Sequence, residues 1–269
     1  MSGTATFAHQ RPVNLGFGLL IVLLYVFLMA PLVMIVGASF TGGLLIEFPP
    51  QGLSLRWYLE FFQRQDLVDG LLMSLRIGAI TAVVTMTVAM MAALAGQAVS
   101  GRLAGWFQLG MTLPLLVPEL LTAVGLLFFL YKIELGKTVA GLQMGHILMS
   151  FPYAYVSIAA AMRQVPQSLE EASQSLGATG WQTFRLVILP LVMPGLAMAG
   201  IFAFINSFDL YTISLLLKPL GGNTLPLALF DFLTYEFKPT AAAAATLSIL
   251  LSILGVALVQ RLVGLQRAF

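Results

Sequence analysis

The sequence contains no cysteine, only two histidines and few charged side chains. Without cysteine, thiol nucleophiles, cysteine-ligated zinc and iron–sulfur clusters are excluded, and His9 and His146 alone offer little for an imidazole metal site. Charged residues make up 9% of the 269 residues, against about 25% in a soluble domain. The 13 basic and 11 acidic residues are scattered over short segments, so no nucleic-acid-binding patch is indicated. The chain is therefore not an ordinary soluble domain.

Apolar residues dominate instead, at 59% of the chain with a mean hydropathy of +0.95. A helix needs about 20 apolar residues to cross the hydrocarbon core of a bilayer. Apolar runs predict six transmembrane helices, at residues 15–40, 71–96, 105–131, 142–162, 189–217 and 241–259. The first run is too long for the apolar region of a signal peptide, which has about 7 to 15 residues, and is expected to be a retained anchor. We predict an all-α integral membrane protein in which residues 1–269 form a single transmembrane domain.

Basic residues do not decide the orientation of these helices. Six of them fall on the side of the two termini and six on the other side, so the positive-inside rule is balanced. The first set is Arg11, Arg102, Arg163, Arg185, Arg261 and Arg267, and the second is Arg56, Arg64, Lys132, Lys137, Lys218 and Lys238.

A polar hairpin of 28 residues joins the fourth and fifth predicted helices. Residues 163–190 read RQVPQSLEEASQSLGATGWQTFRLVILP. Ser168 with Glu171 three positions later fits a capping box, which predicts a short amphipathic helix over 169–176. Gly177 ends that helix, and a second helical piece is expected to run from Trp181 into the next span. On shape alone, this segment suits either an interfacial anchor or a helix that a partner protein pushes.

The spacing within this hairpin resembles the EAA loop of permeases of binding-protein-dependent ABC importers. That pattern is E-A-A, three residues, G, nine residues, I, one residue and L-P. Here Glu171, Ala172 and Ser173 are followed by Gly177 and then by 187–190, which read Val-Ile-Leu-Pro. The sequence departs from the pattern at Ser173 in place of alanine and at Val187 in place of isoleucine.

The resemblance implies a type I ABC importer permease fold with a cytoplasmic coupling helix that docks in a cleft of an ATPase subunit. It carries the coupling role to Glu170, Glu171, Ala172, Ser173, Gly177, Ala178, Leu189 and Pro190. It further implies a bacterial inner-membrane location with cytoplasmic termini, and partnership with two ATPase copies, a second homologous permease, a periplasmic substrate-binding protein and membrane lipid. ATP and magnesium would bind the ATPase, and this chain would catalyse no covalent chemistry and bind no cofactor. Its Gly136-Lys137-Thr138 tripeptide lacks the first glycine of a P-loop, since Tyr131 occupies that place.

Within this family the chain is most similar to the spermidine/putrescine branch, in which two distinct permeases pair. Supporting stretches are Ala38-Ser39-Phe40, Leu55-Arg56-Trp57-Tyr58, Leu113-Pro114, Pro118-Glu119 and Thr224-Leu225-Pro226. Related branches of the family, for aminoethylphosphonate, iron, sulfate or molybdate, are similar in these stretches, so the substrate stays open.

Three ionisable residues fall inside predicted spans, where such groups are expensive and usually functional. Glu119 shares a helical face with Gln108, Thr112 and Thr122 of the third span, and Asp209 lies among polar and aromatic residues of the fifth. Carboxylates beside aromatic rings suit an ammonium group, and the polyamine branch also carries acidic residues at the positions matching Glu119 and Asp209. Arg76 either snorkels to the interface or lines the path, which would favour aminoethylphosphonate. The predicted pathway residues are Glu119, Asp209, Asn206, Thr212, Phe208, Tyr211, Thr122 and Arg76.

Two other classes of protein stay open on composition alone. An ion-coupled secondary transporter could use Glu119 and Asp209 as a proton relay, although no inverted repeat is evident. An intramembrane enzyme would need a nucleophile with a base, or a metal cluster, and neither is visible. His146, at the start of the fourth span, is expected to be a solvated interfacial histidine.

Overall fold

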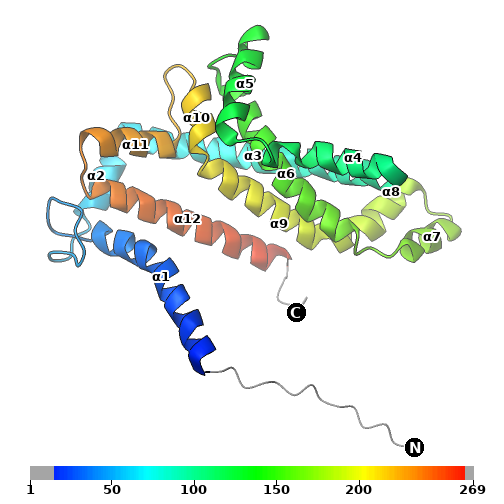
Figure 1. Cartoon of the computed structure of the whole chain (residues 1–269), viewed down its shortest axis with the longest axis horizontal. Helices are drawn as coiled ribbons and strands as arrows, with labels where there is room; N and C mark the ends of the chain where they lie inside the picture. The colour runs from blue at the N-terminus through cyan, green and yellow to red at the C-terminus, as the bar shows by residue number, and fades with distance from the viewer. Residues whose placement is uncertain (1–14, 264–269) are drawn as a thin grey trace, which may run out of the picture.

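The structure, a computed structural model, describes residues 15–263, which are helical apart from loops, turns and one antiparallel bridge between Thr41 and Leu53. The long helices are α1 (Leu15–Ser39), α3 (Gln65–Gln97), α6 (Val139–Met162), α9 (Leu189–Phe208) and α12 (Thr240–Val263) (Figure 1). The shorter ones are α2 (Arg56–Gln63), α4 (Gly101–Thr112), α5 (Glu119–Lys132), α7 (Gln167–Ser175), α8 (Gly180–Thr183), α10 (Tyr211–Leu217) and α11 (Leu225–Tyr235), with a 3₁₀ turn η1 (Leu113–Leu115) and a π-helical turn η2 (Phe184–Ile188). The predicted all-α class is confirmed. Arg11, Arg267 and His9 lie outside the described residues.

Helices α3, α6 and α9 pack closely against one another and form the centre of the bundle. Small residues allow this approach: a β-carbon at Gly195 of α9 would collide with Ala161 of α6, and one at Gly78 of α3 would come within 3.1 Å of the Phe204 ring. The main core cluster, with Ala89, Ile158 and Val192 fully buried, lies between these three helices. In membranes, where lipid is as apolar as leucine, such close contact is what holds helices together.

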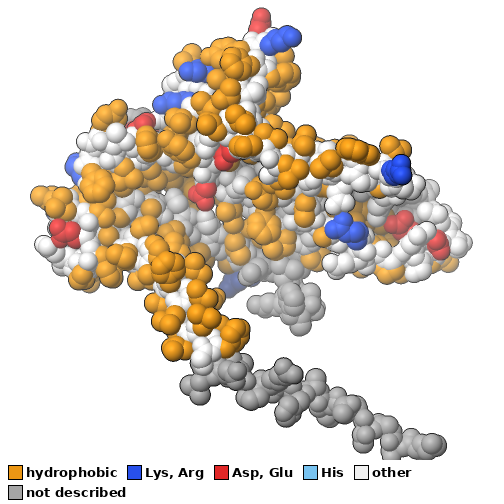
Figure 2. Space-filling view, in the orientation of Figure 1, with side chains coloured by type: hydrophobic (Ala, Val, Ile, Leu, Met, Phe, Trp, Pro, Cys, Tyr) orange, Lys and Arg blue, Asp and Glu red, His pale blue; other side chains and the backbone are white. Residues whose placement is uncertain are grey.

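Helix α1 diverges from this bundle and is apolar on every face (Figure 1). Its large side chains from Phe17 to Ile35 are mostly exposed, and Figure 2 shows them as an apolar surface along the helix. With 25 residues it is about 38 Å long, which spans a hydrocarbon core. An uncovered helix without a polar face belongs in lipid or against another membrane helix, so α1 has the length and the surface of the predicted first span.

Four segments are long and apolar enough to cross a bilayer: α1, α3, the rod from Gly180 to Phe208, and Thr240–Ala257 of α12. The bent pair formed by 101–115 and 119–132 would make a fifth. Helix α6, at 24 residues, is about 36 Å long, but polar side chains such as His146 and Gln143 lower its hydropathy. The count of six therefore stays a prediction.

The prediction of one continuous helix over 105–131 is wrong. The chain turns by 95° between the helical segments 101–115 and 119–132. Pro114 and Pro118 lack the N–H that a continuous helix needs, and Pro118 adopts an extended ψ of 132°. The common face that sequence assigned to Gln108, Thr112, Glu119 and Thr122 therefore does not exist.

The predicted fifth span, 189–217, is also interrupted. Helix α9 ends at Phe208, Leu210 is extended with ψ 91°, and α10 begins at Tyr211. Figure 1 shows α10 and α5 projecting together from the side of the bundle, and they pack against each other. The alignment of Asn206, Asp209 and Thr212 along one helix is thus wrong.

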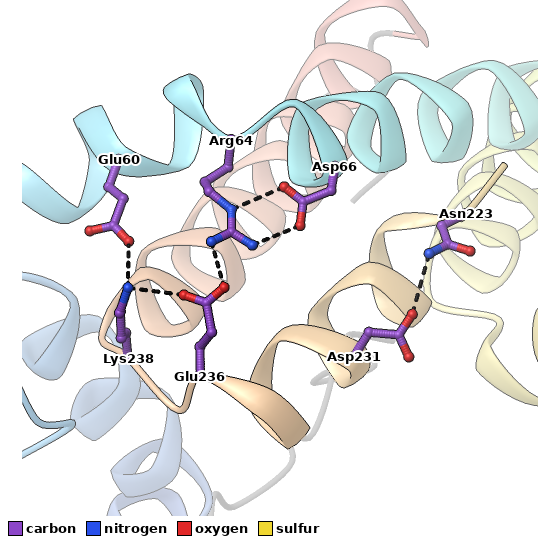
Figure 3. Close-up of polar contacts among 7 residues, drawn as sticks. All are labelled: Glu60, Arg64, Asp66, Asn223, Asp231, Glu236 and Lys238. Carbon is purple, nitrogen blue, oxygen red and sulfur yellow. Dashed lines mark hydrogen bonds and ion pairs between the residues drawn. The ribbon is translucent and has the colours of Figure 1, made fainter. Parts of the chain in front are cut away.

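At the end of the bundle opposite α7, an ionic cluster ties α2 and the start of α3 to the loop between α11 and α12 (Figure 3). Arg64 Nη1 lies 2.6 Å from Glu236 Oε1, and its Nη2 lies 3.0 Å from Asp66 Oδ2. Lys238 Nζ lies 2.9 Å from Glu236 Oε2 and 3.6 Å from Glu60 Oε1. Hydrogen bonds to its charged form hold the pKa of the Glu236 carboxyl below its ordinary value. The bond from Lys238 has the larger effect, and the bond from Arg64 the next.

Candidate functional site

A polar pocket of about 360 Å³ lies where η1, α5, α6 and α9 meet. Residues 114–118 form one wall, Glu119 of α5 lies beside them, and Met149 and Tyr153 of α6 form a second wall. Asn206 of α9 and Leu210, just beyond that helix, complete the lining. The pocket exists because the chain bends at Pro118, which turns the first residue of α5 towards α6 and α9.

Glu119 is the charged residue of this pocket. Its Oε1 is buried and has no hydrogen-bond partner, and no salt bridge to Glu119 occurs among the described residues. A carboxylate left without a cation inside an apolar bundle is costly unless a ligand supplies the missing partner. The pocket therefore offers a negative charge to a small cationic group.

Asn206 lines the same pocket as Glu119 and is held by hydrogen bonds within the bundle. Its Nδ2 donates to Ser150 Oγ at 3.2 Å, and Ser150 donates to the Ala203 carbonyl at 3.4 Å. Among the described residues nothing donates to the Asn206 amide oxygen, so it is left as an acceptor in the pocket that Tyr153 also lines. Sequence reasoning placed Glu119 and Asn206 on the pathway, and the structure brings these two together.

The other predicted pathway residues lie outside this lining. Phe208 is 2% exposed and stacks on Phe204 in the core, and Tyr211 packs against Phe230 of α11, with ring centroids 5.4 Å apart. These two aromatic rings support the bundle and not the pocket. The remaining ones are Asp209, exposed at the end of α9; Thr212, on α10; Thr122, whose hydroxyl donates to the Pro118 carbonyl; and Arg76, exposed on α3.

Tyr153 and Met149 were missed as pocket residues. The available signal was their spacing on one face of α6, four residues apart and followed by Ser157. What could not be read from sequence was which helix this face would meet.

A second pocket, of about 550 Å³, follows along the same two helices towards the α7 end. It includes Ser157, one turn beyond Tyr153, and Phe202, one turn before Asn206. Gln164 adds an amide, and its lining contains no carboxylate. The face shared by α6 and α9 thus carries two successive pockets, with the negative charge in only one of them.

His146 is not the solvated interfacial histidine that sequence predicted. It is 1% exposed and contacts two serine hydroxyls inside the bundle. The prediction was wrong because α6 begins at Val139, so that His146 lies two turns inside the helix and faces α9 and α10.

The polar hairpin forms two short helices joined by a tight turn. Helix α7 ends at Ser175, and Gly177 has φ 84°, a left-handed conformation that favours glycine. Helix α8 then begins at Gly180 and continues through η2 into α9, with Pro190 in the first turn. Two helical pieces separated at Gly177 were predicted, and that prediction is confirmed.

The predicted capping box at Ser168 and Glu171 is wrong. Pro166 is the N-cap residue of α7, so Ser168 already lies in the first turn, and Glu171 accepts a hydrogen bond from Gln167 Nε2 at 3.0 Å. The capping box is found instead at Thr179 and Gln182, which start α8.

The hairpin presents an exposed face away from the bundle. Glu171 and Ala172 are exposed, and Leu176 is 89% exposed, so apolar surface at the tip of α7 is left uncovered in the chain. Figure 2 shows acidic side chains over α7. Glu170 points the other way and lines an apolar cavity of about 780 Å³ with Trp181 and Met90.

A side-chain contact joins the two arms of the hairpin. Ser173 Oγ lies 2.7 Å from Thr183 Oγ1, and Thr183 is 3% exposed. Of the other residues that sequence assigned to coupling, Ala178 donates its N–H to the Ser173 carbonyl at 3.1 Å, and Leu189 and Pro190 begin α9. The motif residues are therefore grouped around the junction between α7 and α9.

An α-helical bundle with exposed apolar helices long enough to cross a bilayer is typical of an integral membrane protein. Residues 85–266 match the family described as binding-protein-dependent transport system inner membrane component, and the chain belongs to this family. It is thus a permease component of the binding-protein-dependent ABC importers, as the hairpin motif predicted.

Curated relatives include several polyamine permeases. The putrescine transport system permease protein PotI of Escherichia coli K12 is 29% identical over 231 residues, covering 83% of this chain and 82% of PotI. The spermidine/putrescine permease protein PotC of Haemophilus influenzae is 26% identical over 244 residues, covering 88% and 91%. A PotC homologue of Mycoplasma genitalium is 31% identical over 259 residues, covering 91% and 89%. The predicted similarity to the spermidine/putrescine branch is confirmed.

Solved structures share the fold at low sequence identity. A chain of a bacterial alginate ABC transporter, in complex with a periplasmic protein carrying an alginate pentasaccharide, superposes with a TM-score of 0.72 over 93% of both chains at 16% identity. A chain of the methionine ABC transporter MetNI, in an inward-facing conformation, gives 0.63 over 74% of this chain and 94% of that one at 18% identity. These likenesses confirm the predicted permease fold.

Proposed function

We propose that this chain forms one half of the membrane pore of an ATP-driven importer for a small organic cation of the putrescine or spermidine type. The observation that carries the substrate class is Glu119, a carboxylate that has no cation partner within residues 15–263 and lies in a pocket that also offers Tyr153 and Asn206. An ammonium group would pair with the carboxylate and hydrogen-bond the amide oxygen. The names of PotI and PotC support the same class.

A zwitterion such as aminoethylphosphonate is the alternative substrate, and it would need a cationic group beside the carboxylate. Arg76 was the candidate, but it is exposed on α3 and does not line the Glu119 pocket. The pocket therefore favours a substrate with ammonium groups alone. Family membership likewise favours the importer over the secondary transporter and the intramembrane enzyme.

The proposed partners follow from the surfaces that the chain leaves uncovered. The exposed face of α7 would dock on a cytoplasmic ATPase, two copies of which bind ATP and magnesium, while this chain binds no cofactor. A second, homologous permease would complete the pore, and a periplasmic binding protein would deliver substrate at the end that carries the Glu236 cluster. This arrangement places the chain in the bacterial inner membrane with cytoplasmic termini.

The same rod of helix links the proposed docking surface to the pocket. From Pro190 to Asn206 α9 runs 16 residues, about 24 Å, without a break. Closure of the ATPase would move α7, and α9 would carry that movement to the Asn206 wall of the pocket. Rigid-body motion of this kind alternates access to a site without any covalent step in the permease.

The test is uptake by the complete complex, co-purified with its ATPase and second permease and reconstituted in liposomes with the binding protein. Uptake of putrescine or spermidine should require ATP, and Glu119→Gln should lower it about tenfold, because a charged hydrogen bond is lost. Glu134→Gln, a matched change at an exposed loop glutamate, should leave uptake unchanged. ATP-independent transport would contradict the importer, and wild-type uptake by Glu119→Gln would remove Glu119 from the site.

A further inference from the structure

His146 forms a polar bridge across the break between α9 and α10. Its Nδ1 lies 2.8 Å from Ser207 Oγ, in the last turn of α9, and its Nε2 lies 3.1 Å from Ser214 Oγ, in α10. All three side chains are buried, at 1%, 2% and 0% exposed. The imidazole of α6 thus holds the two helices on either side of Asp209 and Leu210.

The hydrogens in this bridge have a defined direction. The Ser214 hydroxyl donates to the Leu210 carbonyl, so it can only accept from the imidazole, and the ring hydrogen must lie on Nε2. Nδ1 is then an acceptor, and the Ser207 hydroxyl donates to it. The single hydrogen of the Ser207 hydroxyl has a competing acceptor in Thr81 Oγ1 of α3 at 3.3 Å, but the unprotonated Nδ1 is nearer, at 2.8 Å. A directed chain therefore runs from Ser207 through His146 and Ser214 to the Leu210 carbonyl.

This series of hydrogen bonds ends at Leu210, a residue that lines the Glu119 pocket. Leu210 and Asn206 form the wall of the Glu119 pocket on the α9 side, and they flank Ser207 in sequence. Helix α10 has seven residues, too few to hold its own direction without tertiary contacts. Without the imidazole, the Ser214 hydroxyl keeps its bond to the Leu210 carbonyl and the Ser207 hydroxyl keeps its contact with Thr81. What is lost is the side-chain link between α9 and α10, so the angle at the break is no longer fixed from α6.

We propose that His146 is a positioning residue, which fixes the α9–α10 break and so sets the distance of the Asn206–Leu210 wall from Glu119. It acts through Ser207 and Ser214 and does not touch the substrate. This inference rests on the proposed function, because its effect is measured on transport. A misplaced wall lets the ATPase cycle turn over without capturing substrate, so the expected loss is in substrate imported per ATP hydrolysed.

The experiment compares His146→Leu with His146→Gln in the reconstituted complex. Glutamine offers an acceptor oxygen and a donor NH2 group in place of the acceptor and donor nitrogens of the imidazole, whereas leucine offers neither. We expect the substrate-to-ATP ratio to fall about fivefold in His146→Leu and to recover to within about twofold of wild type in His146→Gln. Thr246→Val removes a buried hydroxyl that bonds to the Ala242 carbonyl of its own helix, α12, and should leave the ratio unchanged.

Ser214→Ala keeps the test decisive if His146→Leu does not accumulate in the membrane, since it removes one hydroxyl and should lower the same ratio. Nitrogen NMR of histidine-labelled complex, with His146→Gln to identify the resonance, should show a neutral ring protonated at Nε2. A wild-type ratio in Ser214→Ala or His146→Leu, or a ring protonated at Nδ1, would overturn the proposal. A complex without ATP-dependent uptake would overturn the proposed function instead, and the two failures are therefore distinct.

Discussion

Ser173 Oγ of α7 lies 2.7 Å from Thr183 Oγ1 at the end of α8. The first arm of the hairpin carries the exposed face, and the second continues through η2 into α9. Ser173 also donates to the Glu170 carbonyl at 2.8 Å, so the hydroxyl of Thr183 is the donor between the arms. This one contact occurs where the sequence departs from the alanine of the EAA pattern.

Thr183→Val should weaken the mechanical link between the arms. Valine keeps the shape but removes the donor, a loss of about 1 kcal/mol. We expect binding-protein-stimulated ATPase activity to persist while substrate imported per ATP falls about twofold or more. Ser175→Ala is the matched control, because the Ser175 hydroxyl bonds only to the Glu171 carbonyl of its own helix. Equal ratios in the two variants would show that the contact plays no part in coupling.

Gly177→Ala should destabilise the turn between α7 and α8. Gly177 has φ 84° with open space around it, so the cost is backbone strain of about 1 kcal/mol and not a collision. Co-purification of the ATPase with the permease should weaken. Gly180→Ala, also in open space but without a positive φ, should retain the ATPase, and a similar loss in both variants would contradict this explanation.

Gly145→Ala should disturb the packing of α6 against α10. A β-carbon there would lie 2.6 Å from Leu217 Cδ1 and 2.8 Å from Ile213 Cγ2, and both side chains are fully buried. Overpacking of this kind costs about 1 to 3 kcal/mol, which should lower the melting temperature of the purified chain in detergent. Gly125→Ala adds the same methyl group in open space on α5 and should be neutral or stabilising. An unchanged melting temperature in Gly145→Ala would mean that α10 can move aside freely.

Asp209→Asn should lower uptake while leaving assembly intact, but less than Glu119→Gln does. Asp209 is exposed at the end of α9 and lies next to Leu210 without lining the pocket itself. Its charge can attract a cation towards the pocket, but it makes no close contact there. Uptake at low substrate concentration measures this effect, and wild-type uptake would remove Asp209 from the pathway.

Acid should weaken the cluster around Glu236. Its pKa lies below the ordinary carboxyl value in the folded chain because of Lys238 and Arg64. The stabilisation is therefore present above the ordinary value and is lost as pH falls through the lowered pKa. Wild type should melt above Glu236→Gln at pH 7, and the difference should shrink towards pH 3. A difference that is constant with pH would show that the carboxylate's charge does not stabilise the fold.

The sequence by itself determined the class of the protein, the first apolar span, the hairpin with its turn at Gly177, and the family. These depend on properties that are local along the chain: an apolar run long enough for a bilayer, a glycine where φ must be positive, and residues at fixed spacing. Glu119 was found for the same reason, since a carboxylate within an apolar run is conspicuous wherever the chain goes.

Only the tertiary structure decided which polar residues meet. The bend at Pro118 turned Glu119 towards Asn206 and Tyr153, and the break after Phe208 separated Asp209 from the helix face to which sequence had assigned it. His146 was misjudged because burial depends on the helices that pack around a residue, and not on its neighbours in sequence. The free energy of pairing buried polar groups is decided between helices, so a pattern along one helix cannot reveal it.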